Sequence, residues 1–242
     1  MNITIADFVV GLEENKELKE RYGKNGFLTI LSPDFVVNVT EQDIMDDMTK
    51  LGGEAFRDRV TNLAIHRKIA ERLPLHDAFL LHSACFDVNG TGVAFAAHSG
   101  TGKTTHMLLW QKILGDKMTV VNGDKPIVRF FENEPETPYA YGTPWCGKEN
   151  LGCNMRTPLK HICFIERADK NSCEPLDKSD AVNLIFNQVY MPKDPAAMMK
   201  TMQLIDRLLS CCKLWKIRCN MESDAAETSF NAIFGKQPAM QR

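Results

Sequence analysis

The chain has 242 residues, 44% of them hydrophobic and 25% charged, which is ordinary for a globular protein that folds as one domain or one domain with a small appendage. Its 29 basic and 31 acidic residues give a net charge of -2, so the charge balance does not indicate nucleic acid as a partner. No apolar stretch approaches the length of a membrane span and no signal peptide precedes the first charged residues, so we expect neither a membrane segment nor export.

The first predicted elements are a pair of short strands and a helix. Residues 27–31 and 35–39 are apolar runs, and residues 32–34 between them carry turn-forming side chains, so we predict a strand hairpin there. Residues 55–73 have apolar side chains at helical spacing and stop before Pro74, which disfavours a helical conformation in the residue that precedes it. The N-terminal part is therefore expected to contain a hairpin and a helix.

A second predicted hairpin leads into a glycine-rich loop. Residues 79–88 and 91–97 are apolar runs separated by Asn89-Gly90, which is the strongest short-range hairpin signal. The second run continues into Ala-His-Ser-Gly-Thr-Gly-Lys-Thr-Thr at residues 97–105. The loop is thus expected to hang from an antiparallel hairpin, whereas in Ras-like and ABC-type proteins it follows a strand of a parallel βαβ sheet.

This loop matches the phosphate-binding pattern G-x-x-x-x-G-K-[ST] at every position except the first, where Ala97 stands. Small residues allow backbone N–H groups to surround phosphate oxygens, and the helix that follows directs its positive end at the same anion. Lys103 would contact the β- and γ-phosphates, and the Thr104 hydroxyl would bind Mg²⁺. We therefore predict a nucleotide polyphosphate as ligand, held by Ser99, Gly100, Thr101, Gly102, Lys103, Thr104 and Thr105.

The chain beyond the loop alternates between predicted helices and strands. The helices are expected from Thr105 to a stop at Gly115, over residues 179–190, over residues 195–212 with Asp194 as the N-cap and Pro195 at the first position, and over residues 224–234 before Gly235. The strands are expected over residues 118–121, 127–131, 159–165 and 214–219, with residues 133–138 forming a surface loop.

Two polar residues stand on or beside these strands. Asp124 ends the apolar strand that begins at Met118, and a carboxylate beside a phosphate loop can hold Mg²⁺ through water or accept the proton of an attacking hydroxyl. The alternative for Asp124 is a solvated turn residue before Lys125. His82 lies within an apolar strand, and such a histidine is by itself more often a packed core residue than a functional one.

Several segments resemble the HPr kinase/phosphorylase family, whose nucleotide core is shared with ATP-dependent phosphoenolpyruvate carboxykinase. The string Ser-Gly-Thr-Gly-Lys-Thr-Thr is similar to the carboxykinase loop, and the resemblance covers roughly residues 80–167, about a third of the chain. The matching segments are Leu81-His82-Ser83, the loop Ser99–Thr105, Val120–Asp124, and Gly142–Glu149, which resembles small HPr-kinase-like proteins from bacterial gene clusters.

This resemblance implies an α/β fold with a P-loop kinase core, in which a hairpin feeds the phosphate loop of a mixed sheet flanked by helices. It divides the chain into residues 1–75, packed on the core, and residues 76–242, the nucleotide-binding core. ATP and Mg²⁺ are the implied cofactors, with Thr104 and Asp124 at the metal. Lys103, Asp124 and His82 are the implied catalytic residues, His82 orienting Asp124 or sharing its proton. HPr kinases assemble as oligomers, which suggests a homo-oligomer here.

The chain departs from the family in two respects. The family usually has a pair of aspartates where this chain has Gly123-Asp124, so one carboxylate is missing. A full carboxykinase is about twice as long and carries a second substrate-binding region, so carboxykinase activity is not the leading prediction. The polar segment 142–156 could close over the phosphates or hold the acceptor through Lys148 and Arg156, although a plain surface loop is an equal alternative.

Three functions remain open at this point. The leading one is an ATP-dependent kinase that transfers the γ-phosphoryl group to a hydroxyl, on a protein or peptide serine or on a small molecule such as free serine. The second is a reaction related to that of phosphoenolpyruvate carboxykinase, and the third is a non-catalytic ATP-binding regulator or scaffold, as Gly123 suggests.

The cysteines bear on the cellular compartment. Eight are scattered without a C-x-x-C pair; Cys211 and Cys212 are adjacent, and Cys146, Cys153 and Cys163 have no metal-ligand spacing. Together with the absence of an export signal, this pattern favours reduced thiols in the cytoplasm over a disulfide framework.

Overall fold

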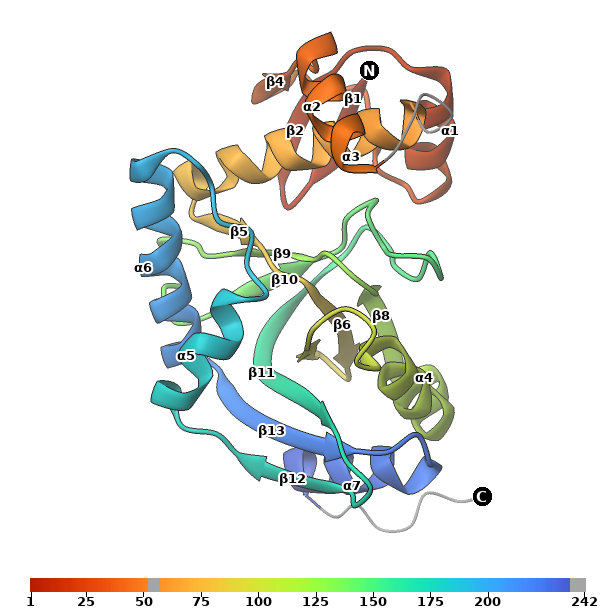
Figure 1. Cartoon of the computed structure of the whole chain (residues 1–242), viewed down its shortest axis with the longest axis vertical. Coiled ribbons are helices and arrows are strands. Elements are labelled where there is room, and N and C mark those ends of the chain that lie inside the picture. Colours follow the sequence, from red (N-terminus) through yellow and green to blue (C-terminus); the bar gives the residue numbers. More distant parts are fainter. Residues whose placement is uncertain (52–56, 236–242) are drawn as a thin grey trace.

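The computed structural model describes residues 1–51 and 57–235, which form a mixed α/β protein with two β-sheets (Figure 1). We call residues 1–51 and 57–76 the N-terminal unit; it carries the smaller sheet and lies at one end of the molecule. Within the described ranges, no helix is long and apolar enough to cross a membrane. The division of the chain into domains at residue 75 stays a prediction.

The smaller sheet has four strands in the order β3-β1-β2-β4. Strands β1 (Asn2–Ile5) and β2 (Phe8–Leu12) form an antiparallel hairpin, β3 (Leu28–Thr29) pairs with β1, and β4 (Phe35–Val37) pairs in parallel with β2. The two runs predicted to form a hairpin, 27–31 and 35–39, therefore lie at opposite edges of the sheet, and that prediction was wrong.

The reason is that the predicted turn is bonded to another strand. The Asp34 carboxylate accepts a hydrogen bond from the Val9 amide at 2.7 Å, and the Asp34 amide donates to the Val9 carbonyl at 2.8 Å. The true hairpin turns at Ala6-Asp7, where both residues have positive φ (47° and 59°) without a glycine or asparagine to signal it. The sequence therefore carries no turn signal that predicts the first hairpin.

Three helices complete the described part of the N-terminal unit: α1 (Lys16–Lys24), α2 (Glu41–Leu51) and α3 (Arg57–Arg72). Helix α3 confirms the predicted helix 55–73, whose first two residues lie outside the described residues, and a 3-10 turn, Leu73–His76, carries the chain through Pro74. Helices α1 and α2 were not predicted.

The larger sheet is mixed, with the order β5-β9-β10-β11-β7-β6-β8 and with β13 paired to both β11 and β12. Strand β11 pairs in parallel with β7 and β13, and the other pairings are antiparallel. The strands are β5 (Ala78–Leu80), β6 (Ser83–Val88), β7 (Thr91–Ala96), β8 (Met118–Asn122), β9 (Ile127–Arg129), β10 (Tyr139–Tyr141), β11 (Arg156–Arg167), β12 (Ser172–Pro175) and β13 (Lys213–Cys219).

The hairpin of β6 and β7 is confirmed. Asn89 and Gly90 have φ values of 50° and 83°, as a two-residue hairpin turn needs, and the Gly90 amide donates to the Asp87 carboxylate at 2.8 Å. Strand β7 also pairs in parallel with β11, so the strand that feeds the loop has one antiparallel and one parallel neighbour.

The predicted strand 79–88 is bent at Leu81-His82. Leu80 stands opposite Ile127, and Cys85 stands opposite Asn122 in the same antiparallel register. Between these pairs, the Leu81 and Ser83 amides donate to the Pro126 and Asp124 carbonyls, at 3.0 Å each. We call this bent antiparallel pair the ladder: residues 78–88 run along residues 118–129 through the bend, which brings His82 beside Asp124.

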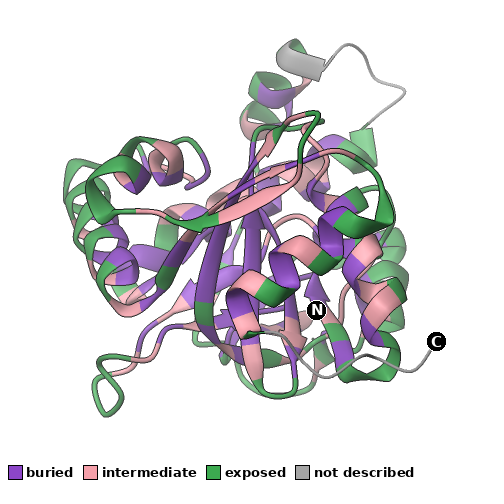
Figure 2. Ribbon diagram, turned by 90° about the horizontal axis from the view of Figure 1, so that it is seen from below, coloured by how far each residue is buried: buried purple, intermediate pink, exposed green. Residues whose placement is uncertain are grey.

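Four further helices flank the large sheet within the described residues: α4 (Lys103–Leu114), α5 (Lys178–Phe186), α6 (Pro195–Cys211) and α7 (Ser223–Phe234). The predicted stop of α4 at Gly115 is confirmed, as is the Asp194 cap, whose carboxylate accepts from the Ala197 amide at 2.8 Å. Figure 2 shows buried residues concentrated on the central strands and exposed residues on the outer faces of helices.

Helix α5 ends four residues before the predicted residue 190. The chain beyond it pairs with the outer side of the bend instead: the His82 amide donates to the Gln188 carbonyl at 2.7 Å, and the Tyr190 amide donates to the Leu80 carbonyl at 3.1 Å. Backbone groups that are hydrogen-bonded to a strand cannot continue a helix. The helical interpretation of residues 187–190 was therefore wrong.

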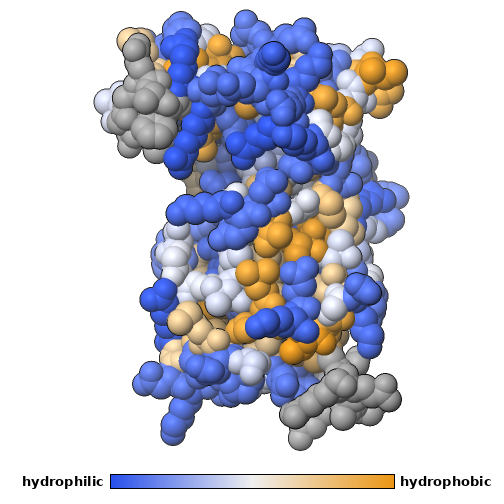
Figure 3. Space-filling view, turned by 90° about the vertical axis from the view of Figure 1, so that its right-hand side faces the viewer, coloured by the Kyte–Doolittle hydropathy of each residue, from blue (hydrophilic) through white to orange (hydrophobic). Residues whose placement is uncertain are grey.

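The N-terminal unit packs on the large sheet through one shared apolar cluster, which includes Ile127, Tyr141 and Trp145 from the core. Polar bonds reinforce this contact: the Arg129 guanidinium donates to the Ala6 carbonyl at 2.6 Å, and the Tyr141 hydroxyl donates to the Asp7 carboxylate at 2.5 Å. On one face of the molecule, hydrophilic residues dominate the N-terminal unit while apolar residues gather on the body below it (Figure 3).

Candidate active site

The glycine-rich loop connects β7 to α4, as the phosphate-loop pattern requires. Gly100 and Gly102 have φ values of 79° and 122°, which side chains other than glycine rarely adopt. The Arg167 guanidinium, at the end of β11, donates to the Thr101 carbonyl at 3.1 Å and also to the Gly100 carbonyl. The loop is therefore shaped by its two glycines and tied from outside by an arginine that the sequence analysis missed.

Lys103, the lysine of the pattern, is the first residue of α4 and is only 7% exposed. Its ammonium donates to the Ala97 carbonyl at 2.8 Å and lies 3.2 Å from His82 Nε2. Burial lowers the pKa of Lys103, the Asp124 charge opposes this, and the Lys125 charge adds to it, so the net shift is downward. The lysine is thus held by the start of its own loop and by the ladder.

Asp124 follows β8 on the ladder, with its Oδ1 3.3 Å from His82 Nε2. Burial raises the pKa of Asp124, but the His82 hydrogen bond and the charges of Lys125 and Lys103 outweigh it, so the pKa is lowered from its ordinary 3.8. The carboxylate is therefore ionised at neutral pH.

His82 Nε2 stands between an ammonium and a carboxylate. A protonated Nε2 can donate to Asp124, whereas an unprotonated Nε2 can accept from Lys103, so the nitrogen makes one of these two hydrogen bonds at a time. The position of one proton on His82 is thereby coupled to both neighbours. The three residues predicted from separate motifs lie in one cluster, which we call the His82–Lys103–Asp124 cluster.

A buried asparagine holds the turn that carries Asp124. Asn122 is fully buried; its Oδ1 accepts from the Asp124 and Lys125 amides at 2.9 and 2.6 Å, and its Nδ2 donates to the Thr143 hydroxyl at 2.9 Å. These bonds fix the backbone of Asp124 against the segment that follows β10. Sequence reasoning quoted Asn122 in a motif but gave it no role, although an asparagine two residues before a turn aspartate signals such a turn.

Gly123 lies beneath the segment 142–155. A Cβ atom at this position would stand 3.0 Å from the Cys146 carbonyl oxygen and 3.2 Å from that of Leu151, and the Gly123 amide donates to the latter at 2.8 Å. A second carboxylate at position 123 would therefore have to displace backbone. The close packing of this segment over the ladder therefore suits the glycine at position 123.

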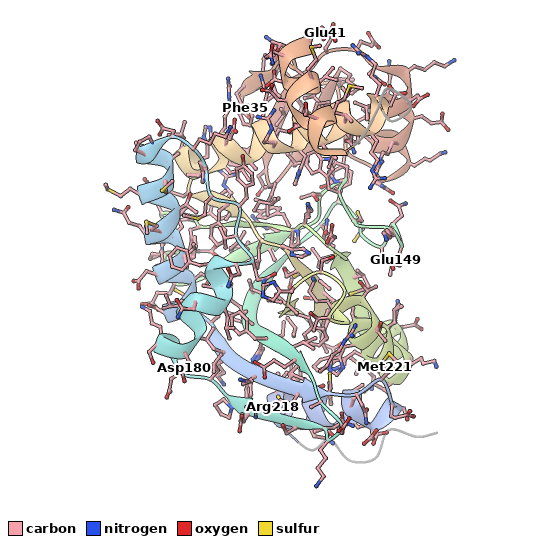
Figure 4. The ribbon with its side chains drawn as sticks, in the orientation of Figure 1. Phe35, Glu41, Glu149, Asp180, Arg218 and Met221 are labelled. Atoms are coloured by element: carbon pink, nitrogen blue, oxygen red, sulfur yellow. The ribbon has the colours of Figure 1, made fainter. Side chains whose placement is uncertain are left out.

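The remaining predicted site residues are dispersed. Thr104 is partly buried on the first turn of α4, and Thr105 is exposed. Lys148 is exposed on the segment 142–155 and lines a cavity that Asp124 also borders; Figure 4 shows the neighbouring Glu149 on this segment, below the N-terminal unit. Arg156 is turned to the N-terminal unit instead, where it donates to the Asp7 carboxylate at 3.1 Å.

A cleft of about 650 Å³ opens beside the cluster, between the core and the N-terminal unit. We call it the acceptor-side cleft. Its lining includes Ser99 of the loop, His82 and Asp124, together with residues of α3 and of the segment 187–190, which is bonded to His82. The loop and the cluster therefore share a concave space large enough for a small molecule.

Comparisons with known proteins add little to this geometry. No family model matches the chain, and no curated protein matches it. Among solved structures, the HPr(Ser) kinase/phosphatase from Coxiella burnetii superposes with a TM-score of 0.29 and 9% sequence identity, over 52% of this chain and 86% of that one. This protein is a distant structural neighbour, and a superposition at this level carries no argument about function.

Proposed function

We propose that the chain is an ATP-dependent phosphotransferase, which transfers the γ-phosphoryl group to a hydroxyl acceptor. The observation that carries this proposal is the convergence of Lys103, His82 and Asp124, with contacts of 3.2 and 3.3 Å, beside a glycine-rich loop at a helix N-terminus. Such a loop suits phosphate, and an ionised carboxylate next to its lysine suits an attacking hydroxyl.

In the proposed reaction the acceptor oxygen attacks the γ-phosphorus, and the new P–O bond forms as the bond to the β,γ-bridging oxygen breaks. ADP leaves, and Asp124 takes the hydroxyl proton. Its lowered pKa makes Asp124 a weak base, which suffices because phosphoryl transfer demands little charge on the nucleophile. Lys103 balances the charge on the transferring oxygens, and His82 holds Asp124 in place.

Mg²⁺ is the metal that this reaction implies. The described residues contain no group of three or more His, Cys, Asp or Glu side chains that could hold a metal ion. In a kinase site Mg²⁺ takes one or two protein oxygens and completes its shell with phosphates and water. Thr104 and Asp124 would supply those oxygens, and the metal would neutralise phosphate charge.

The test measures nucleotide binding and transfer separately. ATP with Mg²⁺ should raise the melting temperature, because a ligand of the folded state stabilises it, and Lys103→Ala should remove most of that shift. Incubation with γ-labelled ATP and hydroxyl acceptors should then move label to an acceptor. A melting shift that Lys103→Ala leaves unchanged would contradict the phosphate loop, and hydrolysis without transfer would contradict the kinase.

Gly123 supports a second candidate, a non-catalytic ATP-binding regulator. The packing of the segment 142–155 leaves position 123 without a side chain, so one carboxylate would have to serve both metal and proton. In the labelling experiment this candidate predicts an ATP-dependent melting shift with neither hydrolysis nor transfer.

A further inference from the structure

The acceptor-side cleft has two unlike walls. On the core wall, His82 Nε2 lies 3.3 Å from Asp124 and also contacts Lys103, which is not among the lining residues, at 3.2 Å. The recognition wall, as we call it, is formed by α3 and the segment 187–190. The apolar side chains of this wall, Leu63, Val189 and the partly buried Tyr190, can pack against the carbon skeleton of a ligand.

Two buried polar atoms of the recognition wall have no hydrogen-bond partner among the described residues. They are Nε2 of His66, a residue that is 6% exposed, and Oε1 of Gln188, which is 4% exposed. Both residues line the cleft, but the two atoms themselves are closed to solvent in the unliganded chain, so a ligand reaches them when the side chains turn toward it. A buried polar atom without a partner costs about 1–3 kcal/mol, so such atoms are rare unless a ligand or water supplies the missing bond.

Neighbouring groups fix both residues where they stand. The His66 ring packs against Trp145, with 4.6 Å between ring centroids, and the Trp145 indole donates to the side-chain Oδ1 of Asn62 at 3.1 Å. The Gln188 backbone is bonded to His82 across the bend at 2.7 Å. The His66 ring and the Gln188 backbone are therefore held in place in the lining of the cleft.

The charged side chains of this wall are already engaged with each other. Arg67 lies 3.2 Å from both Asp43 and Asp47, and the Tyr190 hydroxyl donates to Glu71 at 3.1 Å. Recognition at this wall is therefore left to the neutral groups. Gln188 Oε1 can only accept, so it requires a donor on the ligand, while the His66 ring can donate or accept.

We propose that this cleft binds a small-molecule acceptor that carries a second hydrogen-bond donor besides the reacting hydroxyl, and that His66 and Gln188 recognise it. This inference rests on the proposed phosphotransferase function. A cleft of about 650 Å³ is within the range of small-molecule sites, and its recognition atoms are buried. A second hydroxyl and an amino group are the two sources of the required donor.

The experiment uses the full chain and four probes. Glycerol carries a neutral second donor and L-serine a charged one, propan-1-ol has a single hydroxyl, and a ten-residue peptide with one central serine represents a protein acceptor. We expect labelled phosphate to move to glycerol or L-serine in preference to propan-1-ol. Gln188→Met and His66→Phe should each raise KM for that probe about tenfold, as loss of one hydrogen bond does, with kcat changed less than about threefold.

His161→Phe is the matched control. His161 is a similarly buried histidine, 7% exposed, but it lies on β11 against Trp215 and is not among the residues that line the cleft. Its substitution should leave KM unchanged. Because a buried substitution can prevent folding, melting curves accompany each variant, and Gln188→Asn, which keeps the amide but retracts it by one methylene, should raise KM in the same direction.

The possible outcomes distinguish a failure of this inference from a failure of the proposed phosphotransferase function. Label on the serine peptide alone would overturn the inference and leave the phosphotransferase standing, as would equal KM values in wild type, Gln188→Met and Gln188→Asn. If no acceptor is labelled, the melting temperature is measured with glycerol or L-serine alone. A rise in wild type that is lost in Gln188→Met would support ligand binding in the cleft although the kinase proposal fails. No rise in wild type would overturn both proposals.

Discussion

The two walls of the acceptor-side cleft differ in how their polar groups are satisfied. On the core wall, His82 contacts Asp124, and Lys103 behind it, before any ligand arrives. On the recognition wall, His66 and Gln188 keep buried polar atoms without partners among the described residues. The comparison teaches that the chain itself organises the groups assigned to proton and phosphate chemistry, whereas the groups assigned to recognition are completed from outside.

The walls also differ in how the sequence builds them. The core wall follows from one antiparallel register, because the pairing of residues 78–88 with residues 118–129 sets His82 beside Asp124. The α3 part of the recognition wall follows from packing between separate units, in which Trp145 of the core meets α3 of the N-terminal unit, whereas the segment 187–190 is bonded to the core. Changes to the core wall should therefore alter turnover, and changes to the recognition wall should alter affinity and stability.

The largest effect is expected for Asp124→Asn. If Asp124 takes the acceptor proton, transfer should fall about 10²- to 10⁴-fold, as for loss of a general base. ATP affinity should change less than about tenfold, because the phosphate loop is untouched. The measurement is labelled transfer alongside the ATP-dependent melting shift. Wild-type turnover in this variant would reduce Asp124 to a turn residue and remove the functional distinction between the walls.

His82→Ala should have the next largest effect, lowering kcat about tenfold to a hundredfold. The substitution removes the partner of both Lys103 and Asp124, but the His82 side chain is 29% exposed, so little packing is lost. Turnover per folded molecule and melting temperature are measured on the same preparation. A histidine that serves only packing would give the reverse result, a lower melting temperature with unchanged kcat.

Asn122→Ala should weaken the turn beneath Asp124 and lower the unfolding free energy by about 3 kcal/mol, because it leaves the Asp124 and Lys125 amides without their acceptor. Denaturant titration measures this loss, and kcat should fall while KM for ATP changes less. Asn122→Asp keeps the accepting oxygen and should recover part of the unfolding free energy and part of kcat. Full stability in Asn122→Ala would mean that the segment 142–155 alone holds the turn.

The sequence predicted the core wall far better than the recognition wall. Asn89-Gly90, the loop glycines and the strand ending at Asp124 are local signals, and each stands at the predicted place in the fold. The bend at His82 was not visible, because it depends on two segments, 124–126 and 188–190, that are distant in sequence. Periodicity reports burial along one element and cannot report such pairing.

The N-terminal unit shows the same limit. Its first hairpin turns at Ala6-Asp7 without a glycine, so no turn signal in the sequence indicated strands β1 and β2. The runs 27–31 and 35–39 were therefore predicted to pair with each other. His66 has no ligand spacing in the sequence, and its position in the cleft depends on α3 docking against Trp145. Arg156 was a candidate to hold the acceptor, with a plain surface loop as an equal alternative, but its contacts with Asp7 and Tyr141 direct it to the N-terminal unit.

The smallest predicted effect tests whether the recognition wall is as dry as its geometry indicates. Burial lowers the pKa of His66 to about 3 from an ordinary 6.5, so the folded chain keeps the ring neutral while the unfolded chain protonates it below about pH 6.5. Unfolding then takes up a proton, and the stability contributed by the neutral ring, complete above that pH, is lost as the pH falls toward 3.

Between pH 7 and pH 5 the unfolding free energy of wild type should therefore fall by about 2 kcal/mol more than that of His66→Phe. Denaturant titrations of both proteins at the two pH values measure it. Burial also lowers the pKa of His106 and of His161, to about 4 in each case, but these residues are present in both proteins, so their contributions cancel in the difference. An equal pH dependence in the two proteins would mean that water or a proton reaches His66 in the folded chain. The two walls would then differ in partners but not in their exposure to solvent.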